Sequence, residues 1–163
     1  MDAPMSKADL LAAMETGHQD WQVLLATVGE ARMYTPGAQG DWSVKDIVAH
    51  VAWYEREIAG VMRAHALVGS EHWNLGTHAR NELLAAATRD QPAAVALAAE
   101  QTAYAELAAA VAALDEADLT DAGRFRDMPA GWQPWTLVAE NSYLHYPEHI
   151  QAIRAWIERD DGR

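Results

Sequence analysis

The stretch Trp135-Thr-Leu-Val-Ala-Glu-Asn-Ser-Tyr-Leu-His145-Tyr-Pro-Glu-His149-Ile-Gln-Ala-Ile-Arg-Ala-Trp156 decides the fold, because its apolar residues recur at helical spacing and predict one long helix. The face that should meet the core carries His145 and His149 where leucines would normally lie. An i, i+4 pair places both imidazoles on one side, one turn apart, and such pairs often supply two metal ligands. The alternative is two half-buried histidines that hydrogen-bond to water or backbone carbonyls.

Pro147 lies between the two histidines. Its missing backbone donor and its ring predict a kink or a loosened turn inside this helix. A kink there could turn the two imidazoles apart.

The composition limits the classes of protein. A chain of 163 residues with 50% apolar content predicts a single domain over residues 1–163. No run of about 18 apolar residues occurs, and Met1–Lys7 lacks the basic and apolar regions of a signal peptide, so we expect a cytoplasmic protein. Cysteine is absent, which leaves imidazole and carboxylate as the strong metal ligands. The net charge of −12 argues against nucleic acid or an anionic membrane as a partner.

Alanine is abundant, and glycine and proline gather at a few points, which is typical of long helices. We therefore predict an all-α four-helix bundle. The first helix runs roughly over Ser6–Val28, Ser43 caps the second with Asp46 as its acidic third residue, and Pro92 lies in the first turn of the third.

The segment Gly69–Asp90 connects the second and third helices, and it holds at most a short surface helix at Ala79–Thr88. A connection this long indicates that the chain crosses the bundle, so that these two helices run parallel.

Polar residues on the inner faces of the helices are the candidate site residues. His50 borders the buried stripe of the second helix, and Tyr54 belongs to that stripe. His18 on the first helix either joins a site or is a core histidine with a hydrogen-bond partner. Glu100 on the third helix could orient a histidine, act as an acid or base, or form an ordinary buried hydrogen bond.

If the second and fourth helices pack antiparallel, His50 and His149 lie about 10 and 15 Å from the same end of the bundle. His145 and His149 can then meet His50 in the interior. Three imidazoles leave positions open for water or substrate, which is typical of a catalytic metal site.

The loops carry further candidates. The tryptophans of the loops and helix ends could line the edge of a ligand pocket or close one end of the bundle. Arg124 and Arg126 could hold a substrate carboxylate, or they are solvated. The tryptophans are Trp73, Trp132 and Trp135.

Over nearly its whole length the sequence resembles the DinB/YfiT-like superfamily of four-helix-bundle metalloenzymes. The resemblance rests on Lys7-Ala-Asp-Leu-Leu11, Asp41-Trp-Ser-Val-Lys-Asp-Ile-Val-Ala-His50, Trp73-Asn74 and His145-x-x-x-His149. It implies a metal triad of His50, His145 and His149 that binds nickel, zinc or iron. It also implies transferase or isomerase chemistry with a low-molecular-weight thiol such as mycothiol, bacillithiol or glutathione.

Two other patterns give competing hypotheses. Trp42-Ser43-Val44 and Trp73-Asn74 are similar to the ClbS/DfsB branch, which implies hydrolysis of an electrophile without a histidine triad, or simple sequestration of a small molecule. His145-Tyr-Pro-Glu148-His149 matches the H-x-x-E-H pattern of zinc peptidases, with Glu148 as general base. Glu148 should project about 100° away from His149 on a helix, which disfavours the peptidase.

The function that we predict is a divalent-metal enzyme that activates water or a thiol against a small electrophilic substrate. Tyr54, Glu100 and His18 are candidates for proton transfer or for orienting the ligands. The alternative is a metal-free protein of the ClbS/DfsB type that binds a small molecule without catalysis. Dimerisation through the outer helix faces is a further hypothesis.

Overall fold

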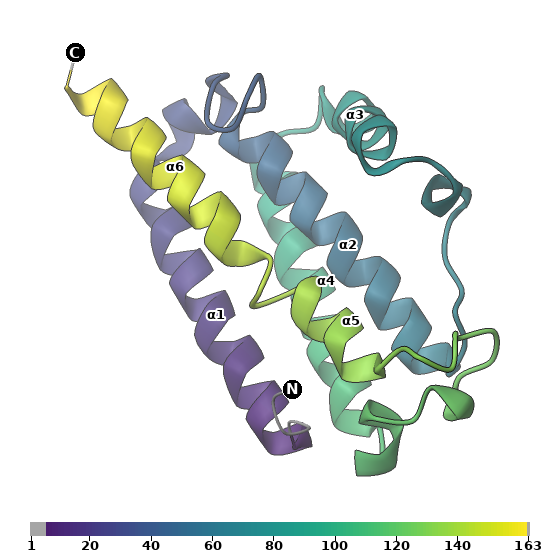
Figure 1. Cartoon of the computed structure of the whole chain (residues 1–163). Coiled ribbons are helices and arrows are strands. Elements are labelled where there is room, and N and C mark those ends of the chain that lie inside the picture. The colour runs from purple at the N-terminus through teal and green to yellow at the C-terminus, as the bar shows by residue number, and fades with distance from the viewer. Residues whose placement is uncertain (1–5, 163) are drawn as a thin grey trace.

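The computed structural model describes residues 6–162, and within that range the chain is helical, with two isolated β-bridges and no strand. Figure 1 shows the arrangement, which confirms the all-α prediction. Residues 1–5, which belong to the segment without signal-peptide features, lie outside the described range. The α-helices are α1 (Lys7–Val28), α2 (Val44–Ala64), α3 (Thr77–Thr88), α4 (Ala93–Ala113), α5 (Pro134–Glu140) and α6 (Tyr146–Asp161). The 3-10 helices are η1 (Glu30–Tyr34), η2 (Glu71–Asn74), η3 (Glu116–Leu119) and η4 (Ala122–Arg124).

The bundle consists of α1, α2, α4 and the line formed by α5 and α6 (Figure 1). Helices α2 and α4 run parallel: the Tyr34 hydroxyl binds the backbone N–H of Ala93 near both helix starts, and His65 contacts Asp118 beyond both helix ends. The connection between them carries η2 and α3, and α3 packs on α2. The predicted four-helix bundle with a long crossover is therefore confirmed.

The predicted caps form. The Ser6 side chain accepts a hydrogen bond from the backbone N–H of Asp9, and Ser43 and Asp46 make a reciprocal capping box at the start of α2. Each cap satisfies backbone N–H groups that have no partner inside the helix. None of the described helices is long and apolar enough to cross a membrane.

A buried polar layer separates two apolar clusters along the bundle. One cluster holds residues such as Met14, Ile58 and Leu107, and the other holds residues such as Trp21 and Val51. Polar side chains lie between them on α1, α2 and α4, and each needs a partner because it is removed from water. The members of this layer are His18, Gln22, Glu55 and Glu100, together with the hydroxyl of Tyr146.

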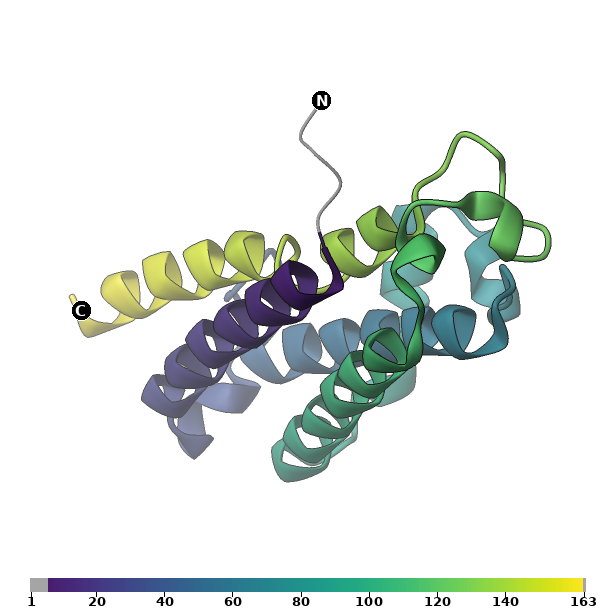
Figure 2. The ribbon, with the colours of Figure 1, turned by 90° about the horizontal axis from the view of Figure 1, so that it is seen from below.

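The last segment is broken, so the prediction of one continuous helix over Trp135–Trp156 was wrong. Helix α5 ends at Glu140 and α6 begins at Tyr146, with a short turn between them (Figure 2). Pro147 lies in the first turn of α6, where its missing N–H would have had no helical partner, so it begins a helix and does not kink one. The hydroxyl of Ser142 and the amide of Asn141 donate to carbonyls of α5, which competes with helix continuation.

Gly17 lets α1 pack directly on this turn. A Cβ at Gly17 would lie 2.7 Å from the Cβ of Tyr143 and 3.1 Å from its Cα. Real Cβ atoms do not approach each other this closely, so only glycine fits at this crossing. The turn that carries His145 is thus held against the bundle.

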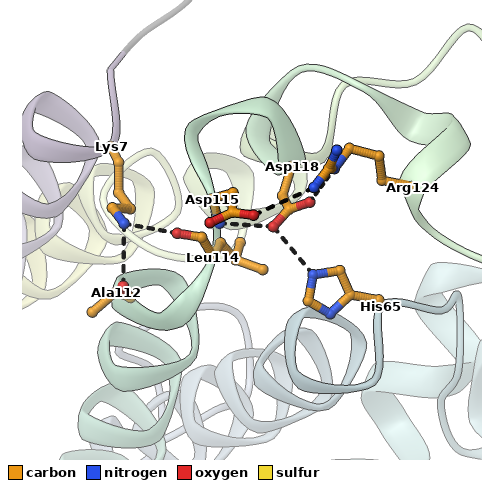
Figure 3. Close-up of polar contacts among 7 residues, drawn as sticks. All are labelled: Lys7, His65, Ala112, Leu114, Asp115, Asp118 and Arg124. Atoms are coloured by element: carbon orange, nitrogen blue, oxygen red, sulfur yellow. Dashed lines mark hydrogen bonds and ion pairs between the residues drawn. The ribbon is translucent and has the colours of Figure 1, made fainter.

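At the end of the bundle where α2 and α4 finish, polar contacts join these two helix ends to the loop beyond them (Figure 3). Asp118 accepts from Arg124 at 2.5 Å and from His65 at 3.2 Å. Arg126 is exposed and pairs with Asp127. Both arginines are exposed, which favours the solvated alternative over a role in binding a substrate carboxylate, and both also form ion pairs. At the same end, the ammonium group of Lys7 on α1 donates to the carbonyls of Ala112 and Leu114 and so joins α1 to the end of α4.

Candidate metal centre

Three histidines from two distant segments meet at one point. His50 lies in the second turn of α2, His145 is the residue before α6, and His149 lies in the first turn of α6. The Nε2 atom of His145 is 3.1 Å from Nε2 of His50 and 3.0 Å from Nε2 of His149. The structure thus brings together the three residues that the sequence selected as metal ligands.

His145 and His149 remain on one helix face despite the break between α5 and α6. His145 has helical backbone angles, with φ −83° and ψ −42°, so the register of α6 already includes it. The two imidazole centroids are 4.7 Å apart, as expected for side chains one turn apart on the same face. Pro147 lies between the two histidines in sequence but does not turn their rings apart. It occupies the first turn of α6, where a proline fits without a kink.

Gln39 sets the tautomer of His149. Its amide nitrogen donates to Glu148 at 3.1 Å, which turns its Oε1 toward His149 Nδ1 at 2.6 Å. An amide oxygen only accepts hydrogen bonds, so Nδ1 of His149 carries the proton and its Nε2 presents a lone pair to the other two rings. A carbonyl or carboxylate on the far nitrogen is the usual partner of a metal-binding histidine.

The surroundings keep the three rings neutral. Burial lowers the pKa of His50 to about 2, and the charge of Arg80 and the charges that His145 and His149 would carry if protonated act in the same direction. Burial and His145 lower the pKa of His149 to about 3. Burial also lowers the pKa of His145, although Glu148 acts in the opposite direction. Neutral imidazoles are the form that binds a metal ion.

The three rings fit a divalent cation. Ligand nitrogens about 2.0–2.1 Å from a metal lie about 3.0–3.4 Å from one another, and the Nε2 separations of 3.0 and 3.1 Å around His145 fall at this spacing. At each of these two contacts at most one nitrogen can carry a proton, and Nε2 of His149 carries none. The Nδ1 atoms of His50 and His145 are buried and have no acceptor among residues 6–162. A cation shared by the three Nε2 atoms would use all three lone pairs.

Aromatic rings form the wall beside the triad. The Tyr54 ring lies 4.7 Å from the ring of His50 and 5.6 Å from that of His145, between centroids. Its hydroxyl points to α3, where it donates to Asn81 at 2.9 Å and accepts from Arg80 at 2.9 Å. The candidate Tyr54 is therefore next to the histidines, with its hydroxyl held by α3.

The triad opens onto a cleft of about 1030 Å³. The loop before α2, the first half of α2, helix α3 and the segment around the last break form its walls. A volume of this size is typical of small-molecule sites. Its polar and charged lining includes Gln39, Lys45, Asp46, Arg80, Asn81, Arg89, Glu140, Asn141 and Glu148.

His18 and Glu100 lie elsewhere, in the polar layer of the core. His18 Nε2 is 2.9 Å from Glu100 Oε1, and the Tyr104 ring stacks on His18 with centroids 3.6 Å apart. Gln22 donates to the second oxygen of Glu100 at 2.7 Å. Neither His18 nor Glu100 lines the cleft, so Glu100 orients a histidine that is not part of the triad.

Glu55 and Tyr146 complete the polar layer. The hydroxyl of Tyr146 donates to Glu55, whose second oxygen is buried and has no partner among residues 6–162. Burial, and then the charge of Glu100, raise the pKa of Glu55 well above its usual value. Tyr146 follows His145 directly in sequence, so this hydrogen bond ties the start of α6 to α2 next to a triad residue.

Sequence reasoning missed Gln39, Glu55 and Arg80. Gln39 has a weak signal, because Gly37 and Gly40 both have positive φ and mark the tight turn that aims it at α6. Arg80 lies four residues before the buried Leu84 and thus on the inner face of α3. Glu55 has no sequence signal of its own, because it sits inside a helix among polar neighbours.

Residues 14–141 match the sequence profile of the family described as mycothiol maleylpyruvate isomerase N-terminal domain. Among curated proteins, no sequence matches this chain.

Three solved structures share the fold. An uncharacterised protein from Escherichia coli UTI89 superposes with a TM-score of 0.80 at 15% identity, over 98% of this chain and 96% of that one. The structure described as sibling lethal factor precursor DfsB gives 0.81 at 14% identity, over 95% and 96% of the two chains. A protein from Streptococcus pneumoniae gives 0.77 at 14% identity, over 97% and 93%. At these identities the likeness concerns the fold alone.

Proposed function

This chain belongs to the mycothiol maleylpyruvate isomerase N-terminal domain family, within the DinB/YfiT-like superfamily, and we propose that it is a divalent-metal-dependent enzyme. The substrate would be a small electrophile, and the nucleophile water or a low-molecular-weight thiol. The observation that carries the proposal is the meeting of three imidazole nitrogens, from the buried His50 and His149 and the half-buried His145, in the lining of an open cleft. Thiol chemistry is supported by the family, whose description names mycothiol.

His50, His145 and His149 would hold the ion through their Nε2 atoms, and Gln39 would fix the proton of His149 on the far nitrogen. When bound, a divalent ion such as zinc, nickel or iron lowers the pKa of a ligated water or thiol and so supplies a nucleophile at neutral pH.

The other residues of the cleft would position the substrate. The rings of Tyr54 and Trp42 pack against His50 and would form an apolar wall for a substrate beside the triad. Three side chains would supply the ligands and would leave coordination positions free, and the cleft that the histidines line gives a small molecule access to them.

The first test is the metal content of protein purified without a nickel column. We expect about one divalent ion per chain in the wild type and a large loss in His145→Ala. His78→Ala is the matched control, because His78 is exposed on α3 and lies outside the triad. Metal far below one ion per chain, unchanged by His145→Ala, would contradict the proposal and would favour a metal-free binding protein.

The second test is activity. Metal-loaded protein is mixed with mycothiol or glutathione and 1-chloro-2,4-dinitrobenzene, and the thioether product is followed by absorbance. We expect the rate above background to fall at least tenfold in His145→Ala and to be retained in His78→Ala. Release of chloride without thioether would instead indicate that water is the nucleophile.

A further inference from the structure

Arg80 is the only buried arginine among residues 6–162, with 7% of its surface exposed. Its positive charge has no carboxylate partner within 4.0 Å in that range, whereas the surface residues Arg32 and Arg63 and the loop residue Arg124 all have one. A buried charge is costly unless it is paired, so a guanidinium kept here without a counter-ion indicates an anion that comes from outside the chain.

The protein positions this guanidinium firmly. Nε donates to the Tyr54 hydroxyl at 2.9 Å, Nη1 to the carbonyl of Leu75 at 3.1 Å, and Nη2 to the hydroxyl of Thr77 at 3.3 Å. The Trp73 ring stacks on the group, 4.6 Å from ring centroid to Cζ. A guanidinium has five N–H groups, and these three bonds leave two of them, one on each terminal nitrogen, for a ligand.

Arg80 lies between two clefts. It lines the cleft of the histidine triad, and it also lines a second cleft of about 720 Å³ on the other side of Tyr54. Tyr54, Glu140 and Asn141 line both clefts as well, so the two are neighbours. Tyr54 contacts both Arg80, through its hydroxyl, and His50, through its ring, and the pKa of His50 senses the arginine charge.

The second cleft is mainly apolar. Several of its side chains are large hydrophobic groups that remain more than a third exposed, which is unusual for residues of this kind when they are grouped together. Such a surface next to a charged group fits a ligand with an apolar body and a polar end. The exposed apolar residues are Leu67, Val68, Trp73 and Trp132, and Ile58, Val61 and Leu137 lie deeper.

The acidic residues of the two clefts favour a ligand with a single negative charge. Acidic side chains line both clefts, and Lys45 is already paired with Asp46 at 3.1 Å. Polyphosphates or tricarboxylates would be repelled by this acidic edge, whereas a single carboxylate needs only the one guanidinium. The acidic residues are Asp41, Asp46, Glu71, Glu82, Glu140 and Glu148.

We propose that Arg80 binds the carboxylate of a monoanionic small molecule whose apolar body lies in the second cleft, between Trp73 and Trp132. The ligand is thereby held with its anionic end one phenol ring away from the histidine triad. That this molecule is the substrate rests on the proposed function, but the binding site itself requires no metal ion.

The test uses two probes with one apolar body, 2-naphthoate and the uncharged 2-naphthalenemethanol. Each is titrated into EDTA-treated, 15N-labelled protein, and the indole N–H signals of the tryptophans are followed. We expect 2-naphthoate to bind about 10- to 100-fold more tightly, as for a charged hydrogen bond, and to shift the Trp73 and Trp132 signals. Equal affinities of the two probes for the wild-type protein would overturn the proposal, whatever the variants do.

Variants place the carboxylate. In Arg80→Gln we expect the preference for 2-naphthoate to disappear, and in Arg80→Lys to persist in part. Arg63→Gln, which removes an exposed arginine that lines neither cleft, should retain the full preference. A preference unchanged in Arg80→Gln would overturn the assignment.

The same titration separates this proposal from the metal. A preference that persists in metal-free wild type and in His145→Ala supports the Arg80 site even if the metal analysis fails. A preference seen only in metal-loaded wild type and lost in His145→Ala would place the carboxylate on the metal and overturn the Arg80 site, while leaving the proposed function intact.

Discussion

Oε1 of Gln39 lies 2.6 Å from Nδ1 of His149, and the other end of the same amide donates to Glu148. This contact joins the loop before α2 to the start of α6 across 110 positions of the chain. It assigns the proton of one candidate ligand, so the loop takes part in the chemistry of the triad as well as in the wall of the cleft.

Gln39→Ala should weaken metal binding. Loss of the oxygen that holds the Nδ1 proton frees the ring and its tautomer, and such changes typically cost about 10- to 100-fold in metal affinity. The measurement is a zinc competition titration with a chromogenic chelator. Gln19→Ala, which removes an exposed glutamine of α1, is the control, and equal zinc affinities of the two variants would refute the role of Gln39.

Zinc binding should release few protons. At pH 6.0, three imidazoles with ordinary pKa values would together release about two protons on metal binding. Burial lowers the pKa of all three histidines, most clearly of His50 and His149, so we expect a value close to zero. Calorimetric titrations in two buffers of different ionisation enthalpy measure this number. A release near two would mean that the rings are charged before zinc binds.

Gly17→Ala should destabilise the protein although alanine favours helices. The new methyl group would meet the Cβ of Tyr143 at 2.7 Å, and overpacking of this kind typically costs about 1–3 kcal/mol. The matched control is Gly60→Ala on α2, where a Cβ has open space and should add up to about 1 kcal/mol. Urea unfolding gives both values. Because Tyr143 precedes His145 by two residues, zinc affinity should also fall in Gly17→Ala and not in Gly60→Ala.

Glu55→Gln should remove a pH dependence from the stability. Burial raises the pKa of folded Glu55, so above pH 4.5 the unfolded chain loses this proton before the folded chain does. The wild type therefore loses free energy of unfolding as the pH rises from 4.5 toward the folded pKa, by up to about 1.4 kcal/mol per pH unit. Glutamine can still accept from Tyr146, so the variant should match the wild type near pH 4.5 and exceed it at pH 8.

Urea unfolding across this range measures the effect, with the exposed Glu30→Gln as the control. Parallel pH profiles for the wild type and Glu55→Gln would show that Glu55 is ionised in the folded protein.

Asp118 should make the protein more stable as the pH rises, which is opposite to the pH dependence from Glu55. Burial acts to raise its pKa, but hydrogen bonds from Arg124, from the backbone of Asp115 and from His65 outweigh burial and lower the pKa to about 2 (Figure 3). The stability is present above an unfolded pKa of about 4 and is lost as the pH falls toward 2. Asp118→Asn should therefore be less stable at pH 7, by about 2 kcal/mol, and the gap should close between pH 4 and pH 2.

Acid-dependent urea unfolding tests this, with Asp127→Asn as control, because Asp127 is exposed and its positive φ also suits asparagine. A gap between Asp118→Asn and the wild type that stays constant down to pH 2 would rule out the ionised carboxylate as its cause.

The sequence by itself determined the all-α class, the caps at Ser6 and Ser43, the crossover and the three histidines. These signals are local: a cap depends on residues three positions apart, and a helical face on residues three or four apart. The parallel run of α2 and α4 also followed, because a connection as long as Gly69–Asp90 has room to cross the bundle.

Only the tertiary structure decided the break before α6, the proton of His149, and the burial of Arg80 without a counter-ion. Each depends on partners far apart in the chain: Gly17 against Tyr143, Gln39 against His149, and Arg80 against the Tyr54 hydroxyl. The local preferences of Pro147 do not distinguish a helix start from a kink, and those of Arg80 do not distinguish an exposed helix face from a pocket wall. Packing decides between these outcomes, because it sets which polar groups lose water and which partners they then meet.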